Sequence, residues 1–377
     1  MPYTTVLIIP TGIGAAIGGY AGDALPVTRA IAQVADILIT HPNVMNGAQL
    51  YWPLSNALYV EGYGLDRFAA GQWGLRPVHR NRVGLLLDAG VEDELRQRHL
   101  QAVDAARATL GIDISHCVIT DAPVGVTLRT ATSGATWGTI DNPGTLLRGA
   151  EQLLKLGADA IAVVARFPDD EDSEALQNYR QGQGVDPLAG AEAVISHLIV
   201  RTFQVPCAHA PALNPLPLDP TLSPKSAAEE IGYTFLPCVL AGLSRAPQFL
   251  TPQNIGSDVT YHVATISDAM YRNATFSSTD LWRDRVDAVI APATAFGGSA
   301  LLSFSGSRTQ LIAVEENHTT LSITPESLGI KALRVRSYLE AIGVMAAHKA
   351  GISPRALAAQ MPSLMPLTTS GLVRHLG

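Results

Sequence analysis

The chain contains few charged residues and few cysteines for its length. Only 16% of its 377 residues are charged, and the net charge is −7. Because no basic cluster stands out, we expect no nucleic-acid partner. No run of about 18 or more apolar residues occurs, so we expect no membrane-spanning segment and no membrane partner. Three cysteines, at 117, 207 and 238, form an odd number without zinc-type spacing, which argues against a disulfide framework.

The first residues also carry no basic-plus-apolar targeting signal. Pro2 and Tyr3 lead directly into an apolar run that we expect to be a strand. Together with the cysteine pattern, this predicts a cytoplasmic protein in a reducing compartment.

Hydrophobic residues, in contrast, are abundant, at 47% of the chain. This content is enough for a large buried core. Short runs rich in valine and isoleucine have the pattern of strands that are buried on both faces of a parallel sheet. These runs are 6–9, 37–40, 83–87, 117–120, 160–165, 205–208, 288–291 and 311–314.

Helical patterns alternate with these runs. Segment 92–110 is amphipathic and is followed by Gly111, a typical helix C-cap, and Asn142 and Pro143 begin a second amphipathic helix. The alternation predicts an α/β fold whose mostly parallel sheet is flanked by helices, doubly wound or related, with room for two lobes.

Three segments are expected along the chain. Residues 1–210 would form an α/β domain with a glycine-rich loop. Residues 211–285 begin with a proline-rich stretch and would form a connection with irregular or helical structure. Residues 286–377 would form a second α/β portion that completes the site.

Proline follows six of the apolar runs, and polar residues lie beside these prolines. If all the strands belong to one parallel sheet, their carboxyl ends lie on one edge, where open α/β sheets bind ligands. The alternative is that prolines, 24 in all, end strands whose following loops are simply exposed. The polar residues predicted at this edge are Thr11, His41, Asn43, Asp121, Arg166, Asp169, His209 and Thr294.

The first strand leads into a glycine-rich loop with Gly12, Gly14, Gly18 and Gly19. Such a loop can aim backbone N–H groups at an anion, although a plain tight turn has the same composition. NAD(P) or a flavin is not favoured, because Pro26 interrupts the expected helix and the next strand lacks the ribose-binding carboxylate.

Two later loops have a similar composition. The loop after strand 288–291 contains Thr294, Gly297 and Gly298, and it would either clamp a ligand or allow close helix–strand packing. Segment 127–144 is rich in threonine and serine, which fits a mobile lid or a β-hairpin.

Acidic residues and histidines provide the candidate chemistry. Strand 311–314 ends in Glu315, Glu316, Asn317 and His318, and carboxylates beside an imidazole can hold a divalent cation or exchange protons. A solvated strand end is the alternative. Neighbouring strand residues point in opposite directions, so only one of the two glutamates would face the site. The proposed catalytic residues are Glu316, His318, His209 and His41.

Glu192 lies in an otherwise apolar helical segment, 188–201, with Ser196 on the same face. If buried, its pKa would be raised unless a cation such as Arg166 or Arg201 pairs with it. A helix face that reaches solvent is the alternative.

Several runs together resemble a known family. They are "PTGIGAAIGGYAGDA", "GVDPLAGAEAVISH", "VPCAHAP", "APATAFGGSALLSF" and "IAVEENHT". The resemblance covers nearly the whole chain and points to a domain of unknown function that is widespread in cyanobacteria and plastids. It implies a cytosolic or stromal setting and brings no activity, cofactor or catalytic residue with it.

These features favour a protein that binds a small anionic metabolite, phosphorylated or carboxylated, at the carboxyl edge of the sheet. Glycine loops would donate hydrogen bonds and Arg166 would provide charge. An enzyme is favoured over a non-catalytic metabolite-binding regulator, because the titratable groups outnumber those that binding requires. A structural subunit is a third class. Substrate, reaction and metal are not specified by the sequence, and assembly into a homo-oligomer is left open.

Overall fold

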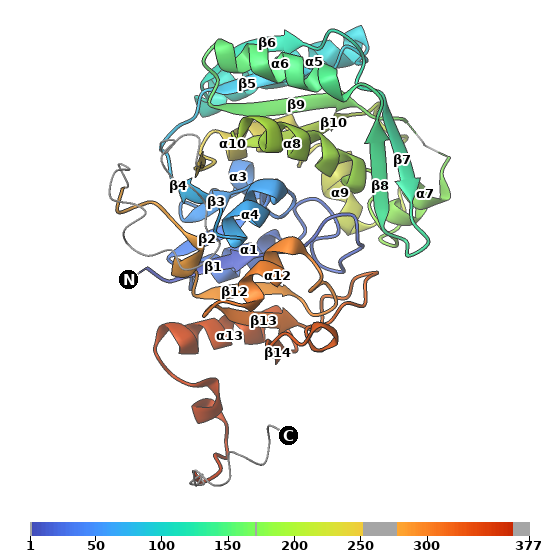
Figure 1. Cartoon of the computed structure of the whole chain (residues 1–377). Coiled ribbons are helices and arrows are strands. Elements are labelled where there is room, and N and C mark those ends of the chain that lie inside the picture. The colour runs from blue at the N-terminus through green and yellow to red at the C-terminus, as the bar shows by residue number, and fades with distance from the viewer. Residues whose placement is uncertain (1, 170–171, 252–276, 365–377) are drawn as a thin grey trace.

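The structure is a computed structural model that describes residues 2–169, 172–251 and 277–364. It contains two parallel β-sheets with helices around and between them, so the predicted α/β class is confirmed (Figure 1). Both ends of the chain build the first sheet, which appears in blue and orange in Figure 1, and the middle of the chain builds the second.

The first sheet has six strands in the order β14-β13-β12-β1-β2-β3, all parallel. β1 lies at its centre and pairs with β12, so segments more than 280 residues apart in sequence become neighbours: Thr5 is in register with Ala288. The strands are β1 (Thr4–Leu7), β2 (Ile37–Thr40), β3 (Ala57–Tyr59), β12 (Ala288–Pro292), β13 (Gln310–Val314) and β14 (Leu333–Val335).

The second sheet has four parallel strands in the order β10-β9-β5-β6. They are β5 (Val83–Leu87), β6 (Ile114–Ile119), β9 (Ala160–Arg166) and β10 (Cys207–Ala212). Every residue of β5 is buried, and β9 is buried up to Ala165, which explains their uninterrupted apolar sequences. Two antiparallel pairs complete the strands: β4 (Gly74–Arg76) with β11 (Gln248–Leu250), and β7 (Val126–Thr130) with β8 (Thr136–Ile140).

The helices largely follow the sequence patterns. α5 begins at Asp93 and ends at Leu110, and Gly111 caps it with a φ of 67°. The exception is the start of the chain, where α1 begins at Leu25. Pro26 therefore lies in the first turn of a helix and does not interrupt one, because residues before it form an irregular loop. The helices that concern the site are α4 (Gly62–Ala69), α8 (Ala189–Phe203), α9 (Pro224–Glu230) and α12 (Ser299–Ser305).

The remaining helices surround the sheets. They are α2 (Pro42–Met45), α3 (Ala48–Tyr51), α6 (Pro143–Lys155), α7 (Glu174–Arg180), α10 (Leu236–Leu243) and α13 (Tyr338–Lys349), with short 3₁₀ turns at Arg283–Arg285, Glu326–Leu328 and Pro354–Leu357.

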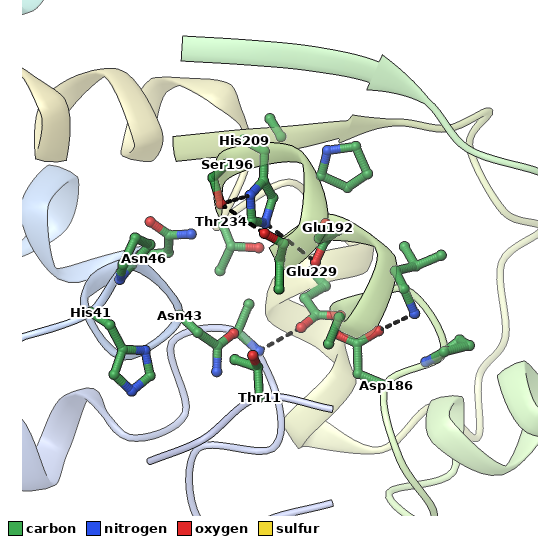
Figure 2. Close-up of a pocket in the computed structure, with 18 of the residues that line it drawn as sticks. Thr11, His41, Asn43, Asn46, Asp186, Glu192, Ser196, His209, Glu229 and Thr234 are labelled. Carbon is green, nitrogen blue, oxygen red and sulfur yellow. Dashed lines mark hydrogen bonds and ion pairs between the residues drawn. The ribbon is translucent and has the colours of Figure 1, made fainter. Parts of the chain in front are cut away.

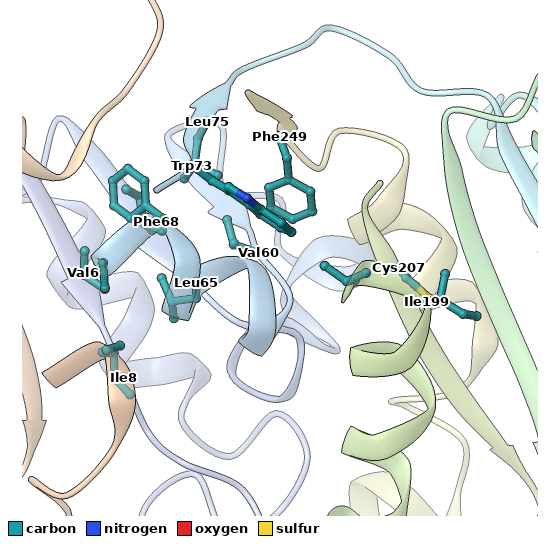
Figure 3. Close-up of a cluster of buried hydrophobic side chains, with 14 of the residues drawn as sticks. Val6, Ile8, Val60, Leu65, Phe68, Trp73, Leu75, Ile199, Cys207 and Phe249 are labelled. Carbon is teal, nitrogen blue, oxygen red and sulfur yellow. The ribbon is translucent and has the colours of Figure 1, made fainter. Parts of the chain in front are cut away.

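One hydrophobic core connects the two sheets. It runs from Val6 on β1 through Phe68 on α4 and Ile199 on α8 to Cys207 on β10 (Figure 3). All four side chains are essentially inaccessible to solvent. α4 and α8 therefore connect the two sheets through this core.

The two sheets divide the chain differently from the three expected segments. Residues 1–210 contribute to both sheets, and residues 286–335 complete the first. Within 211–285, α9, α10 and β11 are described, and residues 252–276 lie outside the described part. Segment 127–144 forms the β7–β8 hairpin followed by the start of α6, as the hairpin alternative predicted.

The hairpin lies directly on the start of α8, and this contact requires a glycine. An added Cβ at Gly190 would lie 2.3 Å from the carbonyl oxygen of Thr136 and 2.4 Å from the Cα of Trp137. Thr136 also donates its backbone N–H to Gly12 O at 2.9 Å and its hydroxyl to Asp186 O at 2.8 Å. The hairpin, the glycine-rich loop and the start of α8 are thus joined.

We predict that Gly190→Ala lowers the free energy of unfolding by about 1–3 kcal/mol, because the methyl group overlaps backbone atoms that cannot rotate away. Gly343 in α13 is the matched control, since an added Cβ there has no neighbour within 4 Å. Gly343→Ala should stabilise the protein by about 0.5–1 kcal/mol through helix propensity. Urea denaturation of both variants measures the difference, and equal effects would contradict the close approach.

Candidate functional site

A pocket of about 1050 Å³ lies where the two sheets and their connecting helices meet. Its lining combines the residues that follow β1 and β2, the middle of β10, and the first turns of α4, α8 and α12, together with α9. This volume is at the upper end of the range for small-molecule sites. Figure 2 shows the polar side chains that converge on it.

Three carboxyl groups, which we call the acidic triad, line this pocket: Asp186, Glu192 and Glu229. Asp186 precedes α8 and accepts a hydrogen bond from the backbone N–H of Leu188 at 2.8 Å. Glu192 lies in the first turn of α8. Glu229, on α9, accepts from the backbone N–H of Ala21 at 2.5 Å and from the hydroxyl of Tyr179 at 2.8 Å. The triad is therefore brought together from α8, the residues before it and α9, and a hydrogen bond from the glycine-rich loop holds Glu229.

Burial and the charges of neighbouring carboxylates raise the pKa values of Asp186 and Glu229. Burial raises the pKa of Asp186 well above its usual value, and the charges of Glu192 and Glu229 raise it further. Burial raises the pKa of Glu229 to about 7, although hydrogen bonds from Ala21 and Tyr179 act in the opposite direction. No salt bridge between described residues joins a lysine or arginine to any of the three. The raised pKa values of Asp186 and Glu229 favour protonated carboxyl groups near neutral pH, and a cation brought by a ligand would favour the ionised forms.

His209 on β10 connects the triad to a buried chain of polar groups. Its Nε2 lies 3.7 Å from an oxygen of Glu192, and its Nδ1 lies 3.2 Å from Oγ of Ser196 (Figure 2). Ser196 Oγ in turn lies 3.4 Å from Oε1 of Glu61, the N-cap residue of α4. An imidazole beside a carboxylate can exchange a proton with a bound molecule.

Glu61 also forms an ion pair with His197, the residue that follows Ser196 on α8. Burial opposes the charged form of His197, but Glu61 and Asp66 together raise its pKa above the usual value. His197 therefore carries positive charge over a wider pH range than an isolated imidazole.

His41 also lines the pocket but, unlike His197, it is neutral near pH 7. Its side chain is buried, and Nε2 accepts a hydrogen bond from the backbone N–H of Ile9 at 3.1 Å. Burial lowers the pKa of His41 to about 4, so the imidazole is neutral near pH 7. Because Nε2 is the acceptor, Nδ1 carries the proton. His41 is therefore a neutral hydrogen-bond donor at the end of β2.

The glycine-rich loop binds the protein's own side chains. The backbone N–H of Gly18 donates to Asp23, that of Ala21 donates to Glu229, and that of Ile17 donates to Asn317 Oδ1 at 2.9 Å. Of the loop residues predicted to bind ligand, Thr11 lines the pocket, whereas Gly12, Gly14, Gly18 and Gly19 do not. The first three of these glycines have φ values of 71°, 58° and 90°, and an added Cβ at Gly19 would lie 2.2 Å from Ala15 O. These contacts favour the tight-turn alternative over an anion cradle.

The second glycine loop has mixed roles. Gly298 lines the pocket at the N-cap of α12. Gly297 allows close packing, since an added Cβ would lie 2.9 Å from Cδ1 of Ile323. Thr294 shares a hydrogen bond of 2.8 Å with the hydroxyl of Thr319 and does not line the pocket.

Glu316 and His318 are not brought to the pocket, which corrects the expectation that they join His41 and His209. Both are exposed beyond the end of β13. Glu316 accepts the backbone N–H of Tyr338 at 2.7 Å, where α13 begins, and the carbonyl of His318 accepts the N–H of Ala16 at 2.8 Å. The reason is strand order: β12 separates β13 from β1, whereas the pocket lies at the ends of β1 and β2.

Asp121 and Arg166 also lie away from the pocket, at the edge of the second sheet. Asp121 forms an ion pair of 2.5 Å with Arg148, whose guanidinium holds the pKa of this carboxyl well below its usual range. Arg166 pairs with Glu92 at 2.9 Å and with Asp169. It lines a separate cavity of about 380 Å³, so the partner of Glu192 is His209 and not Arg166.

The sequence did not indicate Glu61, Asp186 or Glu229 as site residues. Asp186 precedes a proline at the start of α8, and neither glutamate belongs to a recognisable motif. Only burial and proximity distinguish them, and neither has a local signal. Within the described residues, no group of three or more His, Cys, Asp or Glu side chains has a geometry that could hold a metal ion.

The described helices and cysteines were compared with the expectations about membrane spans and disulfides. None of the helices in residues 2–169, 172–251 and 277–364 is both long and apolar enough to cross a membrane. The three cysteines are free, with Cys207 and Cys238 buried and Cys117 exposed.

Comparisons with known proteins place this architecture in a family. Residues 4–358 match the model described as "Protein of unknown function (DUF3326)". The chain is also 62% identical over 355 residues to a protein named "Uncharacterized lipoprotein" from Synechococcus sp., a match that covers 94% of this chain and 93% of that protein. Both findings confirm the resemblance to a cyanobacterial family of unknown function.

We predict that the acidic triad makes the protein less stable as the pH rises. The folded-state pKa of Glu229, about 7, lies above the ordinary glutamate value, so the folded protein binds this proton more tightly than the unfolded chain. Its contribution to stability is complete below about pH 4.5 and is lost as the pH rises through about 7. Glu229→Gln keeps an oxygen for Ala21 and Tyr179 and should raise the free energy of unfolding at about pH 8 by roughly 1–3 kcal/mol.

Denaturation at about pH 5 and about pH 8 tests this expectation. The stability of Glu229→Gln should change less between the two pH values than that of the wild type. Glu94→Gln, which replaces an exposed carboxylate on α5, is the control and should follow the wild type. A Glu229→Gln variant that loses stability at both pH values would contradict the proposed protonation.

Proposed function

This chain belongs to the DUF3326 family, and we propose that it binds a small polar metabolite with a positively charged group and acts on it as an enzyme by acid–base chemistry. The observation that carries the proposal is the acidic triad beside His209 in one large pocket. The sequence predicted the small-molecule ligand and favoured an enzyme, but it favoured an anionic metabolite.

The charge of the pocket supports a cationic group on the ligand. The triad groups repel one another, as the raised pKa values of Asp186 and Glu229 indicate. An ammonium or guanidinium group would replace the retained protons and relieve this repulsion. Arg166, which was expected to attract an anion, is instead engaged by Glu92 and Asp169 outside the pocket.

The proton affinities of the lining groups support catalysis. A pKa of about 7 at Glu229 is in the range that suits a general acid or base at neutral pH. His209 lies at the same end of the pocket beside Glu192. The neutral side chains of Thr11, His41 and Asn43 line the pocket as well and could orient hydroxyl or carbonyl groups of a ligand. Binding alone would not require groups tuned in this way.

The cytoplasmic location remains a proposal. The buried free thiols of Cys207 and Cys238 are compatible with a reducing compartment. The word "lipoprotein" in the name of the Synechococcus protein raises the alternative of a membrane-attached form. Cell fractionation followed by immunoblotting distinguishes the two locations.

We predict that small cations bind and that small anions do not. Thermal-shift and calorimetric titrations with putrescine, agmatine and spermidine should show binding that strengthens between about pH 6 and about pH 8, as Glu229 loses its proton. The double variant Asp186→Asn/Glu229→Gln should bind the best of these probes at least about tenfold more weakly, a change of roughly 1.4 kcal/mol. Glu94→Gln is the control. Binding of inorganic phosphate or glycerate, with none of the cations, would overturn the cationic assignment.

We also predict that replacing His209 lowers turnover much more than ligand binding. The molecule that co-purifies with the protein, identified by native mass spectrometry, should bind His209→Asn within about tenfold of the wild-type affinity. Turnover should fall by about 10²–10⁴, as for the loss of an acid or base. If the wild type binds this molecule and forms no product from it, the non-catalytic regulatory alternative is correct. Unchanged turnover in His209→Asn would remove His209 from the mechanism.

A further inference from the structure

A buried chain of polar groups leads from the N-cap of α4 to the pocket. Glu61 is 4% exposed and Ser196 is 2% exposed, and both line the inner wall of the pocket. Ser196 Oγ lies 3.4 Å from Oε1 of Glu61 and 3.2 Å from Nδ1 of His209. Figure 2 shows the second of these contacts, with the imidazole of His209 between Ser196 and Glu192.

The direction of the hydrogen bonds in this chain follows from what each group can donate. Ionised Glu61 can only accept. Its Oε2 already accepts the backbone N–H groups of Tyr63 at 2.8 Å and Gly64 at 3.3 Å, which leaves Oε1 for Ser196 and His197. The other neighbour of the Ser196 hydroxyl is the carbonyl of Ala193 at 3.5 Å, which is also only an acceptor. When the hydroxyl proton points to one of these oxygens, Oγ presents a lone pair to Nδ1 of His209.

We infer that Glu61 and Ser196 are positioning residues that hold His209 in the tautomer with the proton on Nδ1. Nε2 is then the basic nitrogen, and it faces the pocket 3.7 Å from Glu192. The inference deepens the proposed function and rests on it for its catalytic meaning, because it states which atom of His209 takes the proton. The tautomer itself is a property of the unliganded protein.

The same chain stabilises the charge that forms when His209 accepts a proton at Nε2. The Nδ1–H of the imidazolium continues to donate to Ser196, and Ser196 continues to donate to Glu61, so no group has to reorient during transfer. Glu192 faces the newly protonated Nε2. His197 opposes this stabilisation of the His209 imidazolium. It shares Oε1 of Glu61 with Ser196, and its positive charge makes that oxygen a weaker acceptor.

Replacing Glu61 by glutamine should reverse the direction of the hydrogen bonds from residue 61 through Ser196 to His209. The carbonyl of the glutamine must take the place of Oε2 in order to cap α4, and its NH₂ group then occupies the position of Oε1. This NH₂ group donates to Ser196, whose hydroxyl is free to donate to Nδ1 of His209. We therefore expect Glu61→Gln to shift His209 towards the tautomer with the proton on Nε2. Ser196→Ala removes the acceptor of the Nδ1 proton and should shift the population in the same direction.

Long-range proton–nitrogen correlation spectra of the full-length, isotope-labelled protein measure the tautomer directly. At about pH 9 an ordinary imidazole is neutral, so the two ring nitrogens differ strongly in chemical shift. His209→Asn identifies the His209 signals by their disappearance. We expect the Nδ1–H tautomer to dominate in the wild type by about tenfold or more, which corresponds to roughly 1.4 kcal/mol. The control Glu94→Gln should keep this pattern.

Two results would overturn the inference. One is a wild-type His209 that carries its proton mainly on Nε2. The other is an unchanged Nδ1–H population in both Ser196→Ala and Glu61→Gln, with folded spectra elsewhere. Neither result changes the cation titrations, which test the pocket. A wrong tautomer assignment for His209 can therefore be distinguished from a wrong proposed function. Cation binding could equally fail while the tautomer is as inferred.

Discussion

Helix α8 carries the constraint on which the rest of the structure depends. Its apolar face, with Ile195 and Ile199, belongs to the core that joins the first sheet to the second. Glu192 and Ser196 lie on the same stripe of the helix as these isoleucines, at i, i+3, i+4 and i+7 spacing, and they line the pocket. Its first turn contacts the β7–β8 hairpin through Gly190. Because packed cores tolerate little displacement, the position of this helix fixes the geometry of the site. The pocket is therefore a consequence of how the two sheets are joined.

The glycine-rich loop donates hydrogen bonds to acidic side chains of the protein. The loop directs N–H groups at Asp23 and Glu229, so its donors stabilise carboxylates of the protein itself. These hydrogen bonds only partly offset the burial of Glu229, whose pKa remains raised. The result is a pocket whose acidic groups are held in place but not neutralised. Such a site is prepared for a ligand that brings positive charge or accepts a proton.

Much of the fold could be predicted, because buried parallel strands and amphipathic helices have strong local patterns. The site was predicted only in part. Thr11, His41, His209 and Gly298 do line one pocket. Asp121 and Arg166 were expected there as well, because prolines follow their strands, but β6 and β9 belong to the second sheet and end away from the pocket. A proline marks the end of a strand and carries no information about which sheet the strand joins.

The sequence by itself determined the α/β class, the positions of most strands and helices, and the family to which the chain belongs. Local patterns are sufficient for these properties, since they depend on residues close together in the chain. Tertiary structure alone decided that β1 pairs with β12, and that Glu229 of α9 meets Asp186 and Glu192 beside His209. A carboxylate acquires a raised pKa only from its burial and its neighbours in space. Neither can be read from a run of sequence, because the groups involved come from segments that only folding brings together.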